Sequence, residues 1–234
     1  MEIRRSRAVI LVILSALCMA MSVSACGGPE ALSADQIIAK AVPAINAVNT
    51  FHFTLSTSKV QKAPPGIFIT GVDGDVQKPD KLVGSVTAAY SGIPVKINVV
   101  VDGSSQFWTD PASGKWGPMP SELNMATFFD PSKGMADILS NVKGLTADGT
   151  ENVDGTDTYR LKGSVPATAL KSLTSEVTAT GDISTTLWIG AGDFLLRKAD
   201  LVGPLMSDEP ADVARTLVIK DYNKAVTVQT PVIH

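Results

Sequence analysis

Alternation of apolar and polar residues constrains the fold of this chain more than any other feature of its sequence. Apolar residues occupy every second position at Phe51, Phe53 and Leu55, and the same spacing returns at residues 86–90 and 95–101. A period of two is typical of strands that bury one face. Clusters rich in Gly, Pro and Asp separate these runs and favour antiparallel hairpins. We therefore predict an antiparallel meander in the first half of the chain.

The second half of the chain shows the same period and adds two helices. Helices are predicted at residues 128–143 and, for a short stretch, at residues 166–173. The predicted strands are residues 145–152, 156–163, 183–190, 194–203, 213–221 and 225–230.

The first predicted helix has a clear start signal. Ser33 and Gln36 have the spacing of a capping box, with Ser33 as the N-cap. Apolar residues then recur at helical spacing as far as about Val48, and Pro43 is expected to kink the helix.

The number of strands predicts the architecture. A sheet of about ten strands cannot stay flat, and so few helices cannot cover both of its faces. We predict an α+β fold, in which a strongly curved antiparallel half-barrel carries a few helices on its concave side. Residues 33–234 are expected to form this single domain. Periodicity alone leaves open whether the space between sheet and helices is filled or hollow, and by itself it favours an ordinary core.

Residues 1–25 have the form of an export signal. Arg4, Arg5 and Arg7 precede an apolar run that is too short to span a bilayer comfortably. The sequence Val23-Ser24-Ala25-Cys26 fits the bacterial lipobox, which predicts cleavage before Cys26 and acylation of its thiol. The alternatives are an ordinary signal peptide with a chance cysteine, or an uncleaved signal anchor.

Cleavage before Cys26 would have three consequences. Residues 26–32 would form a short tether that reaches at most roughly 25 Å at about 3.5 Å per residue. The mature chain would hold 17 basic and 22 acidic residues, a balance that argues against nucleic acid as a partner. Without a free thiol, it could form no disulfide and no cysteine-ligated zinc site. The expected location is the outer face of the cytoplasmic membrane.

Catalytic and metal-binding motifs are not evident in the sequence. Of the two histidines, His234 ends the chain and His52 lies on a predicted strand without an acidic partner in an evident motif. The triplet Asp73-Gly74-Asp75 and the acidic run at residues 148–157 lack EF-hand spacing, and their glycines are interpreted as marking hairpin turns. We expect no catalytic residue, no metal and no cofactor.

Three tryptophans remain ambiguous. Trp108, Trp116 and Trp188 lie on three separate segments. They could stack against sugars, and packing inside the protein is at least as good an interpretation.

Several short segments follow the lipobox in a distinctive order. They are Phe51-His52-Phe53-Thr54-Leu55, Gly84-Ser85-Val86, Val99-Val100-Val101-Asp102-Gly103, Asp130-Pro131, Val153-Asp154-Gly155-Thr156 and Thr186-Leu187-Trp188-Ile189. In this order the chain resembles the mycobacterial lipoprotein family that comprises LppX, LprA, LprF and LprG. The resemblance implies a half-barrel around a large apolar cavity that holds acyl chains, with an architecture similar to that of the lipoprotein carriers LolA and LolB.

The resemblance also implies a function and a set of residues. The function is that of a membrane-anchored carrier that moves a lipid or glycolipid between membrane and cell envelope, with a membrane transporter as a candidate supplier of the lipid. A structural or adhesin-like lipoprotein with a filled core and an unrecognised hydrolase remain as alternatives. The candidate cavity-lining residues are Phe51, Phe53, Leu55, Ile69, Val86, Ala88, Tyr90, Ile97, Val99, Ile138 and Leu139.

Two departures from the family pattern stand near the C-terminus. Residues 206–212 look like a longer and more acidic hairpin loop, and Lys220-Asp221-Tyr222-Asn223 stands where the family tends to have a tryptophan.

Overall fold

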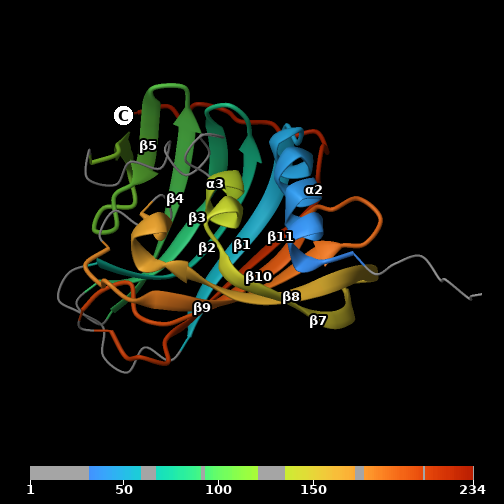
Figure 1. Ribbon diagram of the computed structural model, residues 1–234. Helices are drawn as coiled ribbons and strands as arrows, with labels where there is room; N and C mark the ends of the chain where they lie inside the picture. Colours follow the sequence, from blue (N-terminus) through green and yellow to red (C-terminus); the bar gives the residue numbers. More distant parts are fainter. Residues whose placement is uncertain are drawn as a thin grey trace, which may run out of the picture. The chain divides into compact units, whose positions relative to one another are not determined.

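A single antiparallel sheet of 11 strands dominates the computed structural model (Figure 1). The structure describes residues 32–58, 67–90, 93–120, 135–171, 177–207 and 209–233. The predicted export signal, Cys26, most of the tether and the first part of the helix predicted at residues 128–143 lie outside the described residues. Ser33–His234 forms one compact unit.

The strands follow one another as two meanders. The first six are β1 (Thr50–Ser58), β2 (Ile67–Gln77), β3 (Lys81–Tyr90), β4 (Ile93–Asp102), β5 (Ser105–Thr109) and β6 (Trp116–Pro118). The other five are β7 (Lys143–Val153), β8 (Thr156–Pro166), β9 (Asp182–Gly190), β10 (Leu196–Val202) and β11 (Ala214–Lys220). Because β1 pairs with β11, the two meanders join into one sheet with the order β6-β5-β4-β3-β2-β1-β11-β10-β9-β8-β7.

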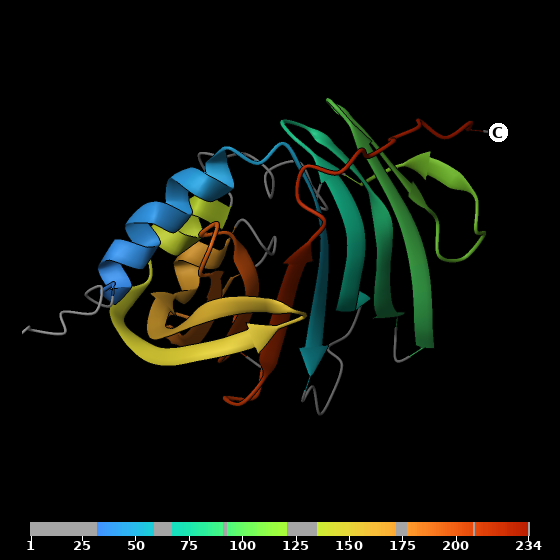
Figure 2. The ribbon, with the colours of Figure 1, turned by 90° about the vertical axis from the view of Figure 1, so that its right-hand side faces the viewer.

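The predicted half-barrel is confirmed. The sheet curls, and helices α2 (Ala34–Asn46) and α3 (Met135–Ser140) lie on its concave side (Figures 1 and 2). A 3₁₀ turn, η3 (Ala167–Leu170), occupies the described part of the short helix predicted at residues 166–173. None of the helices in the described ranges is long and apolar enough to cross a membrane.

The capping box predicted for the first helix is present. The Ser33 hydroxyl accepts a hydrogen bond from the Gln36 backbone N–H at 3.2 Å, and the Gln36 side chain accepts one from the Ser33 N–H at 2.8 Å. These two bonds satisfy backbone donors that the first turn of a helix leaves free. The helix continues through Pro43 and ends at Asn46, two residues before the predicted end.

The interpretation of Asp73-Gly74-Asp75 as a hairpin turn was wrong. The triplet lies in the middle of β2, where Gly74 faces Gly84 of β3. A Cβ atom on Gly84 would lie 2.5 Å from the Asp73 carbonyl oxygen and 2.8 Å from the Gly74 Cα. Gly74 also lies under the ring of Phe53, since its own Cβ would be 3.5 Å from Phe53 Cε1. The glycines are therefore required for close packing of strands in a strongly coiled sheet, and not for a turn.

The strand predicted at residues 225–230 was also wrong. After Lys220 the chain leaves the sheet and continues without regular structure. Both sides of β11 are already occupied, by β1 and by β10, so a further strand at this place has no edge to pair with. The tail is held instead by hydrogen bonds such as that from the Thr230 hydroxyl to Asp102 Oδ2, at 3.2 Å.

Candidate functional site

One face of β1–β4 carries the apolar candidates of the first four strands, and we call it the inner face. Phe53, Gly74, Gly84 and Val99 form one cross-strand row, and Ile69 pairs with Ala88 in another. Side chains in such rows point to the same side of a sheet. The inner face comprises Phe51, Phe53, Leu55, Ile69, Val72, Val76, Leu82, Val86, Ala88, Ile93, Val95, Ile97, Val99 and Val101.

Helices α2 and α3 lie on the same side as this face (Figure 2). Ile138 and Leu139 of α3 are buried. Helix α2 ends beside the β2–β3 turn, where the Lys78 ammonium donates a hydrogen bond of 2.8 Å to the Ile45 carbonyl. Partial burial of this ammonium lowers the pKa of Lys78 below its usual value.

The inner face changes from tightly packed to exposed along the strands. At the end near the turns at residues 78–80 and 103–104, Val76, Leu82 and Val101 are each 0% exposed. At the opposite end, Ile69 is 39% and Ile93 is 65% exposed. We call these two ends the closed end and the open end. The inner face is therefore a filled core at one end and accessible at the other.

A cluster of side chains from distant segments plugs the closed end. The ring of Tyr222 lies 6.5 Å from the ring of Phe51, and its hydroxyl donates to the Leu196 carbonyl. Arg197 lies over the Tyr222 ring at 5.1 Å. Burial raises the pKa of the Tyr222 hydroxyl far above its usual value, so Tyr222 stays neutral.

The start of β1 ties the tail to this plug. The Asn223 N–H donates to the Thr50 carbonyl at 2.8 Å, and the Thr50 hydroxyl donates to the Lys224 carbonyl at 2.6 Å. Asp221 and Asn223 both have φ values of 57°, which turn the chain out of β11 and across the strand end. We did not predict this plug from the sequence. The available signal was the pair Asp221 and Asn223, because Asp and Asn tolerate the left-handed region better than most residues.

The predicted lining residues fall into three groups. Phe51, Phe53, Val86, Ala88, Ile97 and Val99 are buried on the inner face, together with Ile138 and Leu139 on α3. Leu55 is half-buried and Ile69 is exposed, both toward the open end. Tyr90 ends β3 at the open end, and its side chain lies outside the described residues.

His52 lies on the opposite, outer face of β1 and has acidic partners that the sequence did not reveal. Its Nδ1 is 3.0 Å from Asp75 Oδ1, and its Nε2 is 3.4 Å from Asp73 Oδ2. The partners come from the neighbouring strand β2, so only the strand pairing brings the three side chains together. Among the described residues, no group of three or more His, Cys, Asp or Glu side chains is arranged to hold a metal ion.

Trp188 also faces outward, but it is packed and not available for stacking. It is 6% exposed, lies 4.3 Å under the Lys198 ammonium and donates from Nε1 to Glu151 Oε2 at 2.9 Å. This hydrogen bond and the nearby Arg160 hold the pKa of Glu151 below its usual range. For Trp188, packing was therefore the correct alternative.

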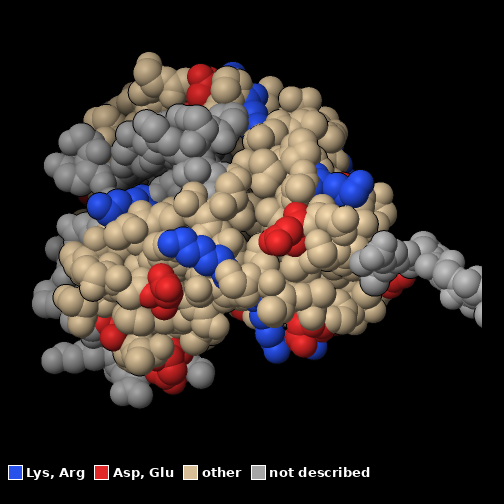
Figure 3. Space-filling view, in the orientation of Figure 1, with Lys and Arg blue, Asp and Glu red and all other residues tan. Residues whose placement is uncertain are grey.

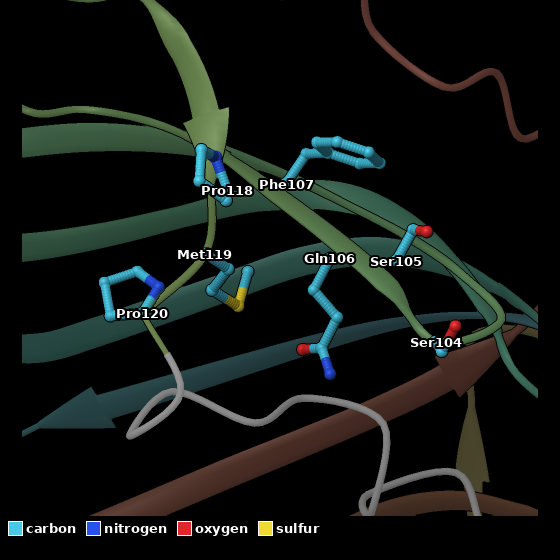
Figure 4. A pocket seen from close by; sticks show the side chains of 7 residues that line it. All are labelled: Ser104, Ser105, Gln106, Phe107, Pro118, Met119 and Pro120. Carbon is cyan, nitrogen blue, oxygen red and sulfur yellow. The ribbon is translucent and has the colours of Figure 1, made fainter.

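A separate hollow of about 470 Å³ lies at the β5–β6 edge of the sheet. Figure 4 shows that Phe107 and Gln106 point to opposite sides of β5 there. Its described lining comes from β5, β6 and their flanks: Ser104, Ser105, Gln106, Phe107, Pro118, Met119 and Pro120. We assign no ligand to it.

Comparison with known proteins agrees with this geometry. Residues 33–228 match the family model of the LppX_LprAFG lipoproteins. The lipoarabinomannan carrier protein LprG of Mycobacteroides abscessus is 26% identical over 204 residues, which cover 87% of this chain and 86% of that protein. Lipoprotein LprA of Mycobacterium tuberculosis is 26% identical over 207 residues, which cover 85% of this chain and 82% of LprA.

Two solved structures share the fold. The crystal structure of LprF from Mycobacterium bovis superimposes with a TM-score of 0.71 and 18% identity, covering 85% of this chain and 96% of LprF. LppX from Mycobacterium tuberculosis gives a TM-score of 0.58 and 24% identity, covering 82% of this chain and 96% of LppX. The open sheet and its helix-covered apolar face thus define a half-barrel of the LprF and LppX type. The chain belongs to the LppX_LprAFG lipoprotein family, as the order of its motifs predicted.

Proposed function

We propose that this protein is a membrane-anchored carrier that binds the acyl chains of a lipid or glycolipid against its inner face. It would carry this ligand between the membrane and the cell envelope. The observation that carries the proposal is the change along the inner face, where apolar side chains run from a plugged closed end to an accessible open end. The relatives named as lipoarabinomannan carriers support a ligand with both sugar and acyl parts.

The chemistry of this face suits an acyl chain. Its side chains are aliphatic or aromatic along four neighbouring strands. A methylene group that binds there would therefore be removed from water without contacting a charged group. Each methylene removed from water contributes about 0.8 kcal/mol, so affinity would grow with chain length. This function needs no catalytic residue, metal or cofactor.

The anchor is part of the same proposal. Residues 1–25 would be removed on export, and acyl chains on Cys26 would hold the protein at the outer face of the cytoplasmic membrane. Residues 26–32 would keep the folded domain of residues 33–234 within roughly 25 Å of the bilayer. A carrier in this position could receive its lipid from a membrane transporter.

A second candidate is a structural lipoprotein without ligand. It is favoured by the plug and by the complete burial of Val76, Leu82 and Val101 at the closed end. If packing of this kind extended to the open end, no acyl chain could enter.

Titration of the isolated Ser33–His234 unit with a fluorescent fatty acid separates the two candidates. We expect saturable binding with a stoichiometry of one or two, and displacement of the probe by a diacyl lipid. A soluble sugar without acyl chains should not displace it. If the probe shows no saturable binding, the carrier function is wrong and the structural candidate stands.

A further inference from the structure

Of the large apolar side chains that are exposed, three lie at one end of the sheet. Within the described residues there are five such side chains: Ile69, Ile93, Val202, Val232 and Ile233. Ile69 and Ile93 lie at the open end of the inner face, and Val202 ends β10 at the same end of the sheet but on its outer face. The other two belong to the C-terminal tail. Scattered single residues of this kind are normal on a protein surface, but Ile69 and Ile93 both lie at the mouth of one apolar face, on the two strands that flank β3.

The described inner face of β1–β4 carries no charged residue at the open end. The described strand segments at residues 55–58, 69–72, 86–89 and 93–95 contain no Asp, Glu, Lys or Arg, and the next residue of β4, Lys96, pairs with Thr87 and lies on the outer face. The turns at the closed end carry Lys78, Asp80, Lys81 and Asp102. On the helix-covered side, charges of both signs are scattered and form no single field (Figure 3). Moving the open end out of water would therefore cost less free energy than moving any other part of these strands.

The N-terminal end of the folded unit also lies away from the closed end. Helix α2 ends at the closed end, where Ile45 is bonded to Lys78, so its first turn lies away from that end. Figures 1 and 2 show both the start of α2 and the end of β1 below the closed end. A helix of 13 residues rises about 20 Å and a strand of nine residues about 30 Å. Along the direction of β1 alone, the roughly 25 Å reach of the seven-residue tether exceeds this difference.

We propose that the open end of the inner face docks on the lipid bilayer and that acyl chains pass through it. We call Ile69 and Ile93, the two exposed side chains of the inner face, the docking rim. These side chains enter the interfacial layer of the membrane, while Leu55 and Val95 behind them continue the apolar path toward Val86. This inference rests on the proposed carrier function, because docking serves to transfer the ligand.

The absence of charge at the rim predicts how docking responds to conditions. Attraction between basic residues and anionic lipids weakens as salt screens it, but burial of apolar side chains does not. The contribution of Ile69 and Ile93 to docking should therefore be the same on uncharged and anionic vesicles, and it should persist at high salt.

The test compares two substitutions at similarly exposed apolar residues. Ile93→Asp places a charge at the rim, at a side chain that is 65% exposed, and Val232→Asp places one in the tail, at a side chain that is 70% exposed. Both are made in the isolated Ser33–His234 unit, which lacks the acyl anchor. Transfer of a fluorescent diacyl lipid from phosphatidylcholine vesicles to the protein is then followed over time, together with flotation of the protein with the vesicles.

We expect Ile93→Asp to slow lipid transfer about tenfold and to reduce flotation, since an ionised carboxylate must stay in water. Val232→Asp should change neither by more than about twofold. The variant Ile69→Ser/Ile93→Ser, which adds no charge, should fall between them. Lipid transfer at the wild-type rate in both rim variants would overturn the role of the docking rim. An equal loss of transfer rate in Val232→Asp would overturn it as well.

Binding of the soluble fluorescent fatty acid separates this inference from the carrier function. Because Ile93 also belongs to the inner face, Ile93→Asp should weaken binding of that probe less than it slows vesicle transfer, since the probe reaches the inner face from water. A wild-type protein that fails to bind the probe would sink the carrier function and the transfer step with it. Equal loss of probe binding and vesicle transfer in Ile93→Asp would show that Ile93 acts only as part of the binding face and would overturn the docking role.

Discussion

Substitution of Glu209 by Ala is expected to lower the free energy of unfolding by about 3–5 kcal/mol. Glu209 belongs to the acidic loop between β10 and β11, yet its side chain is only 4% exposed. One carboxylate oxygen pairs with the Arg215 guanidinium, which is 11% exposed. The other accepts the Leu205 and Met206 N–H groups at 2.7 and 3.2 Å. Alanine would leave a nearly buried guanidinium without a counter-charge and two backbone donors without an acceptor.

Thermal unfolding of the Ser33–His234 unit measures this loss, and a shift of the midpoint by roughly 10 °C is expected for a domain of this size. The control is Lys224→Ala, which removes an ion pair with Asp221 from a side chain that is 70% exposed and should cost less than about 1 kcal/mol. Removing both charges, in Glu209→Gln/Arg215→Met, should recover part of the stability. An unchanged midpoint in Glu209→Ala would mean that this ion pair does not hold the loop.

Substitution of Val86 by Trp is expected to abolish most acyl-chain binding while changing stability little. Val86 is 6% exposed and shares a row with Leu55, Val72 and Ile97, between the closed and the open end. An indole placed in ligand space would displace several methylenes, each worth about 0.8 kcal/mol. Binding should therefore weaken by at least about a hundredfold. The measurement pairs a melting curve with the fatty-acid titration.

Two control substitutions test whether Val86 lies in ligand space or in a filled core. Leu82→Trp forces the same ring into the closed end, where Leu82 is 0% exposed, and should destabilise by about 1–3 kcal/mol or more. Thr87→Trp puts the ring on the exposed outer face of the same strand and should change neither stability nor binding. A Val86→Trp protein that melts as early as Leu82→Trp would show that position 86 belongs to a filled core.

Local patterns predicted the elements of this fold well. The alternation at Phe51, Phe53 and Leu55 identified β1 and the side chains on its inner face, because in a strand the period itself fixes the face. The capping box at Ser33 and Gln36 fixed the start of α2, since both of its bonds lie within one turn of chain.

Features that depend on distant neighbours could not be predicted in this way. Gly74 has the composition signal of a turn, and only the approach of Gly84 explains why it stands inside a strand. Val226 and Val228 alternate with polar residues as in a strand, but the neighbours of β11 leave them no partner. In both cases the sheet order decided the outcome, and the local sequence does not encode that order.

The sequence predicted that the apolar candidate residues share one face of the sheet, but not the change in exposure along that face. Period and resemblance together pointed to Phe53, Val86, Ala88 and Val99, which the structure places on one face. The closed end depends on Tyr222, which comes from 171 residues beyond Phe51 in the sequence. Long-range contacts of this kind carry no signature in a single sequence.

Native mass spectrometry of the purified Ser33–His234 unit tests the central claim most directly. Acyl chains held against the inner face should survive purification from cells that make the natural lipid. The account predicts a protein mass raised by one or two lipid molecules, and return to the bare mass after extraction with organic solvent. A protein that carries no lipid, and that takes up none when incubated with a diacyl lipid, would contradict the assignment of this half-barrel as a carrier.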